Sequence, residues 1–190
     1  MRDFPGFMIA DTGRVPPRVC LIGMMGTGKS TIGRVLAARH AVDFIDTDLA
    51  LEAHAGRTIA DLFARDGEAR FRLLETQMLA QCLGGSRVVI STGGGVVLSA
   101  VNRSLLAARA TTVWLKADID TLWQRVHRDS ARPLLNTADP HATLRELMRR
   151  RDALYRECAD LCVETDALTP DQVADEIEAR LVGSPLHSIV

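Results

Sequence analysis

Residues 18–31 read RVCLIGMMGTGKST. The run 18–23 is mostly apolar and rich in residues that favour strands, which predicts a buried strand. The run 30–40, STIGRVLAARH, places its apolar side chains at helical spacing. Between them, residues 23–30 match GxxxxGK[ST], and this pattern between a strand and a helix is typical of a phosphate-binding P-loop. We therefore expect an α/β fold organised around this loop.

The expected chemistry of the loop follows from its residues. Glycines allow successive main-chain N–H groups to face phosphate oxygens, and the N-terminus of the following helix adds positive potential. We expect Lys29 to reach the β and γ phosphates, Ser30 to bind Mg²⁺ and Thr31 to donate to the α phosphate. Lys116 is the only other lysine and stands in WLKAD, not in a guanine-reading NKxD, which disfavours a GTPase. The remaining ATP-binding residues expected from the motif are Gly26, Thr27 and Gly28.

Short β-rich runs recur along the chain between segments with helical periodicity, at 42–48, 87–92, 111–116 and 160–165. Strands that alternate with helices predict a parallel sheet with helices on both faces. Segment 59–83 is long enough for two helices around the Asp66-Gly67 pair, and 128–141 is polar and proline-containing, as in a mobile loop. We expect one domain over 18–182, between tails at 1–17 and 183–190.

Composition restricts the class of partner. The chain has 47% hydrophobic and 25% charged residues and a net charge of -1, which gives no reason to expect binding to nucleic acid or to an anionic membrane. It has no apolar run of about eighteen residues and no signal-peptide core, so we expect a cytoplasmic protein. Its four cysteines form no CxxC pair, which favours free thiols. We expect a monomer that binds small molecules.

Two carboxylates follow the second predicted strand, in Asp46-Thr47-Asp48. At positions i and i+2 of an extended strand end they would lie on the same side, next to the P-loop. We assign Asp46 to a water on Mg²⁺, and Asp48 to the attacking hydroxyl, whose proton it would take. The alternative is that these residues only cap the next helix.

A glycine run and two arginine-rich segments complete the candidate site. STGGGVVL, residues 91–98, follows the third strand, and its three glycines would let a ligand approach the main chain, although an ordinary tight turn is the alternative. A carboxylate ligand calls for bidentate arginines, which GEARFRLLE at 67–75 and RRRDALYRE at 149–157 supply on helical segments. Since the chain contains 21 arginines, composition does not choose among them.

Over about residues 18–180 the chain resembles the shikimate kinase family. The resemblance implies a three-layer P-loop NTPase fold of the nucleoside monophosphate kinase type, with a five-stranded parallel sheet in order 2-3-1-4-5 and a mobile lid. It also implies transfer of phosphate from ATP to the 3-hydroxyl of shikimate, a step of chorismate and aromatic amino-acid biosynthesis. The matching segments, in order, are LIGMMGTGKSTIGR, FIDTDLALE, GRTIADLFARDGEARFRLLE, STGGGVVL, RPLL and RRDALYRE.

The same resemblance implies roles for individual residues on the acceptor side. Asp48 would hold the ring hydroxyls, and the substrate-binding segment would span about 48–77. The substrate carboxylate would be clamped by Arg72 and Arg151. The ring would contact Gly94 and Gly95.

On the nucleotide side, the resemblance implies a lid arginine, Arg132, that covers the phosphates, and an adenine-stacking Arg125. The chain departs from the family in ETDALTP, residues 164–170, where related enzymes often carry basic residues. Two alternatives stay open: a sister kinase for aminoshikimate or gluconate, and a catalytically silent nucleotide-binding module. The second would require a missing lysine, carboxylate or lid arginine, and none is missing.

Overall fold

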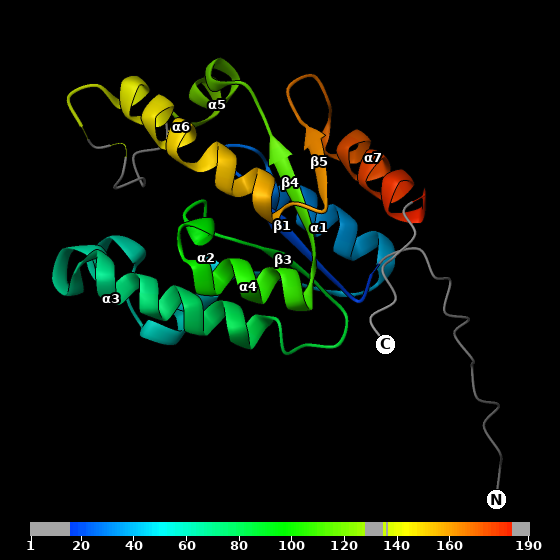
Figure 1. The fold of residues 1–190 in the computed structure, drawn as a ribbon, viewed down its shortest axis with the longest axis horizontal. Helices are drawn as coiled ribbons and strands as arrows, with labels where there is room; N and C mark the ends of the chain where they lie inside the picture. Colours follow the sequence, from blue (N-terminus) through cyan, green and yellow to red (C-terminus); the bar gives the residue numbers. More distant parts are fainter. Residues whose placement is uncertain (1–15, 128–134, 136, 184–190) are drawn as a thin grey trace, which may run out of the picture.

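The protein is described by a computed structural model over residues 16–127, 135 and 137–183. Five parallel strands form one sheet in the order β2-β3-β1-β4-β5 (Figure 1). This confirms the predicted sheet and its strand order. The strands are β1 (Arg18–Ile22), β2 (Asp43–Asp46), β3 (Val88–Ser91), β4 (Thr111–Lys116) and β5 (Leu161–Glu164).

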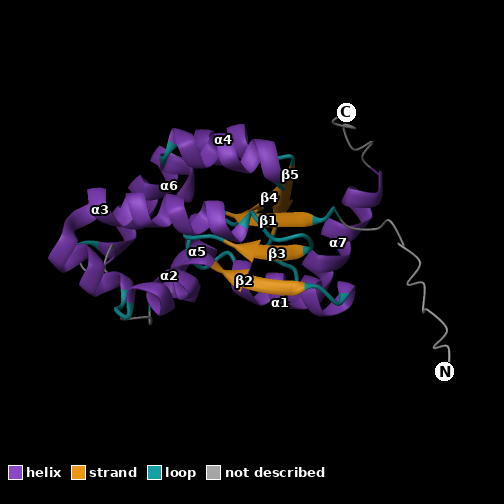
Figure 2. Ribbon diagram, turned by 90° about the horizontal axis from the view of Figure 1, so that it is seen from below, coloured by secondary structure: helices purple, strands orange, loops and turns teal. Residues whose placement is uncertain are grey.

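Helices cover both faces of the sheet, which gives the expected three layers. Figure 2 shows α1 and α7 on one face, and α3, α4 and α6 on the other. The helices are α1 (Lys29–His40), α2 (Thr47–Ala55), α3 (Ile59–Cys82), α4 (Ala100–Arg109), α5 (Ile119–Val126), α6 (Pro140–Cys158) and α7 (Pro170–Gly183), with a 3₁₀ turn η1 (Val96–Leu98).

Strand β1 lies at the centre of the sheet, between β3 and β4. Val19 and Leu21 pack in the core on the α1 and α7 face, whereas Cys20 and Ile22 pack in the core on the opposite face. All four side chains are at most 1% exposed. Since successive strand residues point to opposite faces, a strand buried on both sides is apolar throughout. The two cores thus bury β1 up to its last residue, Ile22, and the P-loop begins directly after it at Gly23.

The arrangement expected for Asp46 and Asp48 on one extended strand is wrong. Strand β2 ends at Asp46, and Asp48 already lies in the first turn of α2. Asp46 Oδ1 accepts the main-chain N–H groups of Asp48, at 3.1 Å, and Leu49, at 3.3 Å. These N–H groups have no partner within the helix, so an aspartate at this position ends the strand and caps the helix. Asp46 therefore does cap the next helix, but it does not only cap it, because its other carboxylate oxygen, Oδ2, accepts a hydrogen bond from Ser30.

Two predicted loop features can be compared with the structure. Gly67 interrupts α3 with φ 77° and ψ 168°, which confirms the break at Asp66-Gly67. The predicted loop 128–141 extends two residues too far, because α6 begins at Pro140, where Asp139 caps the helix and accepts the N–H of Ala142 at 2.9 Å. Arg132 and most of this loop lie outside the described residues, so the lid stays a prediction. The tails at 1–15 and 184–190 also lie outside them.

The four cysteines are free, as predicted. Cys20 and Cys82 are buried, and Cys158 and Cys162 are half-buried. Across the described parts of the chain, every helix is too short or too polar to cross a membrane.

Packing of α1 on β2 generates a prediction. A Cβ atom at Gly33 would lie 2.5 Å from Phe44 Cε2 and 3.3 Å from Leu21 Cδ1. Alanine has the higher helix propensity by about 1 kcal/mol, but the overlap is with a ring in the core. We expect G33A to lower the free energy of unfolding by about 1–3 kcal/mol, measured by chemical denaturation. The double variant G33A/F44L should lose less than the two single variants combined, and additive losses would contradict this explanation.

Candidate active site

The P-loop connects β1 to α1 through a backbone with a positive φ at three glycines, Gly23, Gly26 and Gly28. Gly23 has φ 140°, and a Cβ atom there would lie 2.3 Å from the main-chain oxygen of Leu115. Gly28 has φ 90° and immediately precedes α1. The loop therefore turns tightly against β4 and directs the N-terminus of α1 at the space above it. This is the geometry in which main-chain N–H groups bind phosphate.

Lys29 lies folded over the loop. Its Nζ donates to the main-chain oxygens of Gly23, at 2.9 Å, and Met24, at 2.8 Å. Its ammonium is thus held where phosphate oxygens would approach. The buried Oγ1 of Thr27 donates to the Met24 oxygen at 2.9 Å and stabilises the loop itself, while its expected contact with ATP stays a prediction.

A cluster of oxygen atoms lies beside the first turn of α1. Ser30 Oγ donates to Asp46 Oδ2 at 2.6 Å and lies 3.3 Å from Ser91 Oγ. Asp46 thus caps α2 with one carboxylate oxygen and binds Ser30 with the other. Hydroxyl and carboxylate oxygens suit a hard cation that keeps most of its waters, so this cluster fits Mg²⁺. Sequence reasoning missed Ser91, although its place at the end of β3, in register with Asp46, could have indicated it.

A groove of about 530 Å³ extends from the P-loop to the glycine run. Its lining includes Gly26, Gly28, Lys29, Ser30 and Thr31 of the P-loop and α1, together with Asp46, Asp48, Leu49, Ser91, Thr92 and Gly94. The groove therefore brings a phosphate-binding loop together with two carboxylates, as a phosphoryl transfer requires.

Asp48 lies against the glycine run. A Cβ atom at Gly93 would lie 2.7 Å from Asp48 Oδ1 and 3.2 Å from Glu75 Oε1. Side-chain oxygens from α2 and α3 thus approach the main chain at a distance that only glycine permits. The glycine run also forms a hydrogen-bonded turn, because the Val96 N–H donates to the Gly93 oxygen at 3.1 Å. The expected approach of a ligand to this main chain stays a prediction.

Arg72 is held at the edge of this site by carboxylates. Its Nη1 donates to Glu75 Oε2 at 2.9 Å, and its Nη2 to Glu68 Oε1 at 3.1 Å. Glu75 is 3% exposed. Burial raises its pKa, and the adjacent Arg72 guanidinium opposes this shift. Sequence reasoning missed Glu75, and its position one helical turn after Arg72 was the available signal.

Arg151 reaches the glycine run from α6. It is 3% exposed, and its Nη1 donates to the main-chain oxygen of Gly94 at 3.2 Å. The other arginines of these two segments are exposed: Arg70, Arg149, Arg150 and Arg156. Arg72 and Arg151 are therefore less exposed to solvent than the other arginines of their segments. Composition alone does not reveal this difference.

Arg125 lies on the nucleotide side. This exposed side chain donates from Nη1 to the Gly26 oxygen at 3.2 Å and from Nη2 to the Thr165 oxygen at 2.9 Å. It therefore links the P-loop to the 164–170 loop.

Comparison with known proteins identifies the family. The profile described as shikimate kinase matches residues 25–182. The chain belongs to the shikimate kinase family. A shikimate kinase from Cereibacter sphaeroides is 45% identical over 172 residues, which cover 90% of this chain and 86% of that protein. One from Ruegeria pomeroyi is 48% identical over 164 residues, or 86% of this chain and 84% of that protein.

Solved structures agree with this assignment to the shikimate kinase family. A shikimate kinase from Acinetobacter baumannii, solved in complex with shikimate, superposes with a TM-score of 0.88 at 36% identity, covering 91% of this chain and 97% of that one. A gluconokinase from Sinorhizobium meliloti reaches a TM-score of 0.54 at 16% identity over 90% of this chain and 94% of that one, which shows a shared fold alone.

In this member of the shikimate kinase family, the carboxylate of Asp48 destabilises the fold when it is ionised. Burial raises its pKa to about 6, the Asp46 and Glu75 carboxylates add to the shift, and Lys29 opposes it. A folded-state pKa above that of the unfolded chain means that the fold disfavours the ionised form. The ionised carboxylate is therefore maintained at neutral pH at the expense of stability.

We expect D48N to raise the melting temperature of the free protein at pH 7, because the amide removes a buried charge from the neighbourhood of two other carboxylates. Differential scanning calorimetry of the free protein measures this. The matched control is D43N, which makes the same change in net charge at an exposed position of β2 and should leave the melting temperature unchanged. A lower melting temperature for D48N would contradict the electrostatic account.

Proposed function

We propose that this protein transfers the γ-phosphoryl group of ATP to the 3-hydroxyl of shikimate. One observation carries the proposal: the P-loop and the arginine-flanked glycine run meet in a single groove. Membership of the shikimate kinase family supports it, with named relatives 41–48% identical over most of the chain.

On the nucleotide side, Lys29 and the main chain of the P-loop would bind the ATP phosphates, and Thr31 would contact the α phosphate. Ser30 and Asp46 would hold Mg²⁺, which when bound neutralises charge on the phosphates. Arg125 would stack on adenine, and its hydrogen bonds to the Gly26 oxygen of the P-loop and to the Thr165 oxygen support this role.

On the acceptor side, Asp48 would accept a hydrogen bond from the attacking hydroxyl and take its proton as the new O–P bond forms. Arg72 and Arg151 would bind the shikimate carboxylate from the two sides of the glycine run. The ring would lie on Gly94 and Gly95, and the segment 48–77 would carry most of the substrate contacts.

Arg132 would stabilise the charge that moves to the leaving oxygen, and a lid over 128–141 would exclude water that competes as acceptor. We also propose that the protein acts as a cytoplasmic monomer on small molecules, since its near-neutral charge gives no reason to expect binding to nucleic acid or to an anionic membrane.

A substrate panel tests the function. With ATP and Mg²⁺, ADP release should be fastest with shikimate, and kcat/KM for gluconate should be at least a hundredfold lower. The panel should include aminoshikimate, because the arginines recognise its carboxylate equally. Chelation of Mg²⁺ should stop turnover, and D48N should retain about 1% of activity or less. No ADP release with shikimate would exclude the proposed function.

The contact between Gly95 and Arg72 gives a second test. A Cβ atom at Gly95 would lie 2.5 Å from Arg72 Nη1, and Gly95 has φ -94°, which alanine also adopts. We therefore expect G95A to fold normally but to displace the guanidinium and raise KM for shikimate about tenfold, with KM for ATP unchanged. R72A should have the same effect, whereas R70A, which removes an exposed arginine of the same helix, should match the wild type. If G95A had the same KM for shikimate as the wild type, the proposed role of Arg72 in binding the carboxylate would be contradicted.

A further inference from the structure

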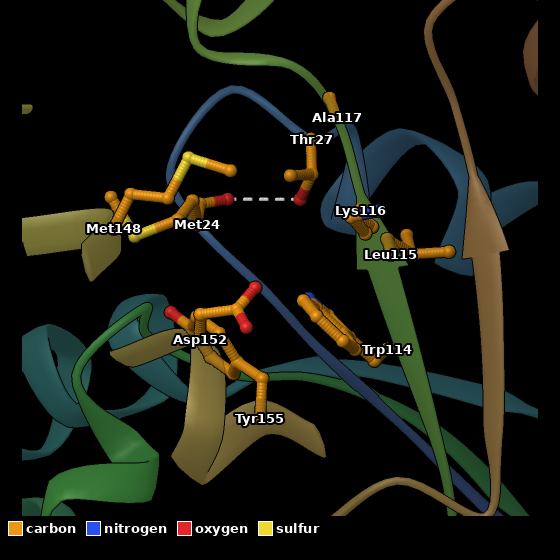
Figure 3. Close-up of a pocket in the computed structure, with 9 residues that line it drawn as sticks. All are labelled: Met24, Thr27, Trp114, Leu115, Lys116, Ala117, Met148, Asp152 and Tyr155. Carbon is orange, nitrogen blue, oxygen red and sulfur yellow. Dashed lines mark hydrogen bonds between the residues drawn. The ribbon is translucent and has the colours of Figure 1, made fainter. Parts of the chain in front are cut away.

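Tyr155, the only tyrosine in the chain, contacts the glycine run from inside the protein. It is 1% exposed, and its hydroxyl donates to the main-chain oxygen of Gly94 at 2.5 Å. Its ring stacks on Trp114 of β4, with centroids 5.8 Å apart and planes at 23°. Both residues line a small cavity of about 10 Å³ between α6, β4 and the P-loop, with Thr27 and Met24 across it (Figure 3). The phenol is thus fixed on the side of the glycine run that faces the core.

Two donors from α6 share the Gly94 oxygen. Arg151 Nη1 lies 3.2 Å from it, and Tyr155, one helical turn later, makes the shorter bond. Peptide bonds in the described residues are trans, so the Gly94 carbonyl and the Gly95 N–H point in opposite directions. Holding this carbonyl toward α6 turns the Gly95 N–H away from α6. Within the described residues, no acceptor is found for that N–H.

A run of three glycines does not fix this orientation by itself. Glycine has the largest choice of backbone conformations, so the peptide between Gly94 and Gly95 could rotate without steric penalty from side chains. Arg151 alone would hold the peptide poorly, because the same guanidinium is required for the substrate carboxylate. Tyr155 has no such second task. Burial raises its pKa to about 12, so its hydroxyl remains a donor at neutral pH.

We propose that Tyr155 is a positioning residue for the acceptor substrate. Its hydroxyl fixes the peptide between Gly94 and Gly95 so that the Gly95 N–H faces the bound substrate, and it frees Arg151 to bind the carboxylate. This role rests on the proposed function, because it requires that a carboxylate substrate lies on the glycine run.

The test is Y155F, which keeps the ring and removes only the hydroxyl. KM for shikimate should rise about fivefold, as expected for the loss of one buried hydrogen bond, while KM for ATP stays within twofold of the wild type. The control is W114F, which disturbs the packing of the same ring but keeps the hydroxyl. W114F should lower the melting temperature and leave both KM values unchanged. A Y155F enzyme with unchanged KM for shikimate, or with both KM values raised in parallel, would refute the positioning role.

A second measurement does not depend on the stability of Y155F. Because Tyr155 is the only tyrosine, 3-fluorotyrosine labels this position alone in the otherwise unchanged protein. Its ¹⁹F resonance should shift when shikimate binds, since Arg151 then turns to the carboxylate and Tyr155 becomes the main donor to Gly94. An unchanged resonance with saturating shikimate would overturn the inference. Wild-type protein that does not turn over shikimate would overturn both this role and the proposed function, whereas normal wild-type turnover with an unaltered Y155F would overturn this role alone.

Discussion

The close contact between the P-loop and β4 is the constraint on which the site depends. Gly23 lies so close to the main-chain oxygen of Leu115 that no side chain fits between them. This contact is possible because β1 is buried on both faces between its neighbours in the sheet. The carboxyl ends of parallel strands lie along one edge, so the segments after β1, β2 and β3 meet there. The packing of the core thus brings together the phosphate-binding loop, the capping aspartate Asp46 and the glycine run.

Charge at this edge is arranged for chemistry at the expense of stability. Asp46, Asp48 and Glu75 are three acidic side chains close enough for each of the others to raise the pKa of Asp48. Only part of this repulsion is offset within the protein, by Lys29 and by the pairing of Glu75 with Arg72. A carboxylate so placed is a better proton acceptor than one in water, because its pKa is closer to neutral pH.

Prediction from sequence succeeded where the signal was local. The strands, the P-loop and the break at Gly67 follow from periodicity and from glycine placement over a few residues. The geometry of Asp46 and Asp48 was predicted wrongly. An aspartate at this position can either continue a strand or cap a helix, and here Asp46 caps α2, which begins at the next residue. Ser91 and Tyr155 were missed because their roles arise from contacts distant in sequence, such as the 61 residues that separate Tyr155 from Gly94. Glu75 was missed although its partner Arg72 is only one helical turn away. Burial, which no motif encodes, distinguished Arg72 and Arg151 from the four exposed arginines of their own two segments.

Two of the three glycines after β3 are required by close contacts. Gly93 accommodates the Asp48 carboxylate and Gly95 the Arg72 guanidinium, whereas Gly94, where a Cβ atom would make only ordinary van der Waals contacts, is the residue whose carbonyl binds to α6. Removing three side chains makes room for the substrate but also removes the steric terms that would hold the backbone in one conformation. The loop therefore needs an external anchor, and a rigid aromatic side chain with a single hydroxyl donor orders the peptide with little loss of side-chain entropy. A lysine or arginine in place of Tyr155 could donate the same bond, but it would add a charge beside Arg151 and compete for the substrate carboxylate. A buried tyrosine is thus the side chain that fixes the peptide without changing the charge that the site presents to its ligand.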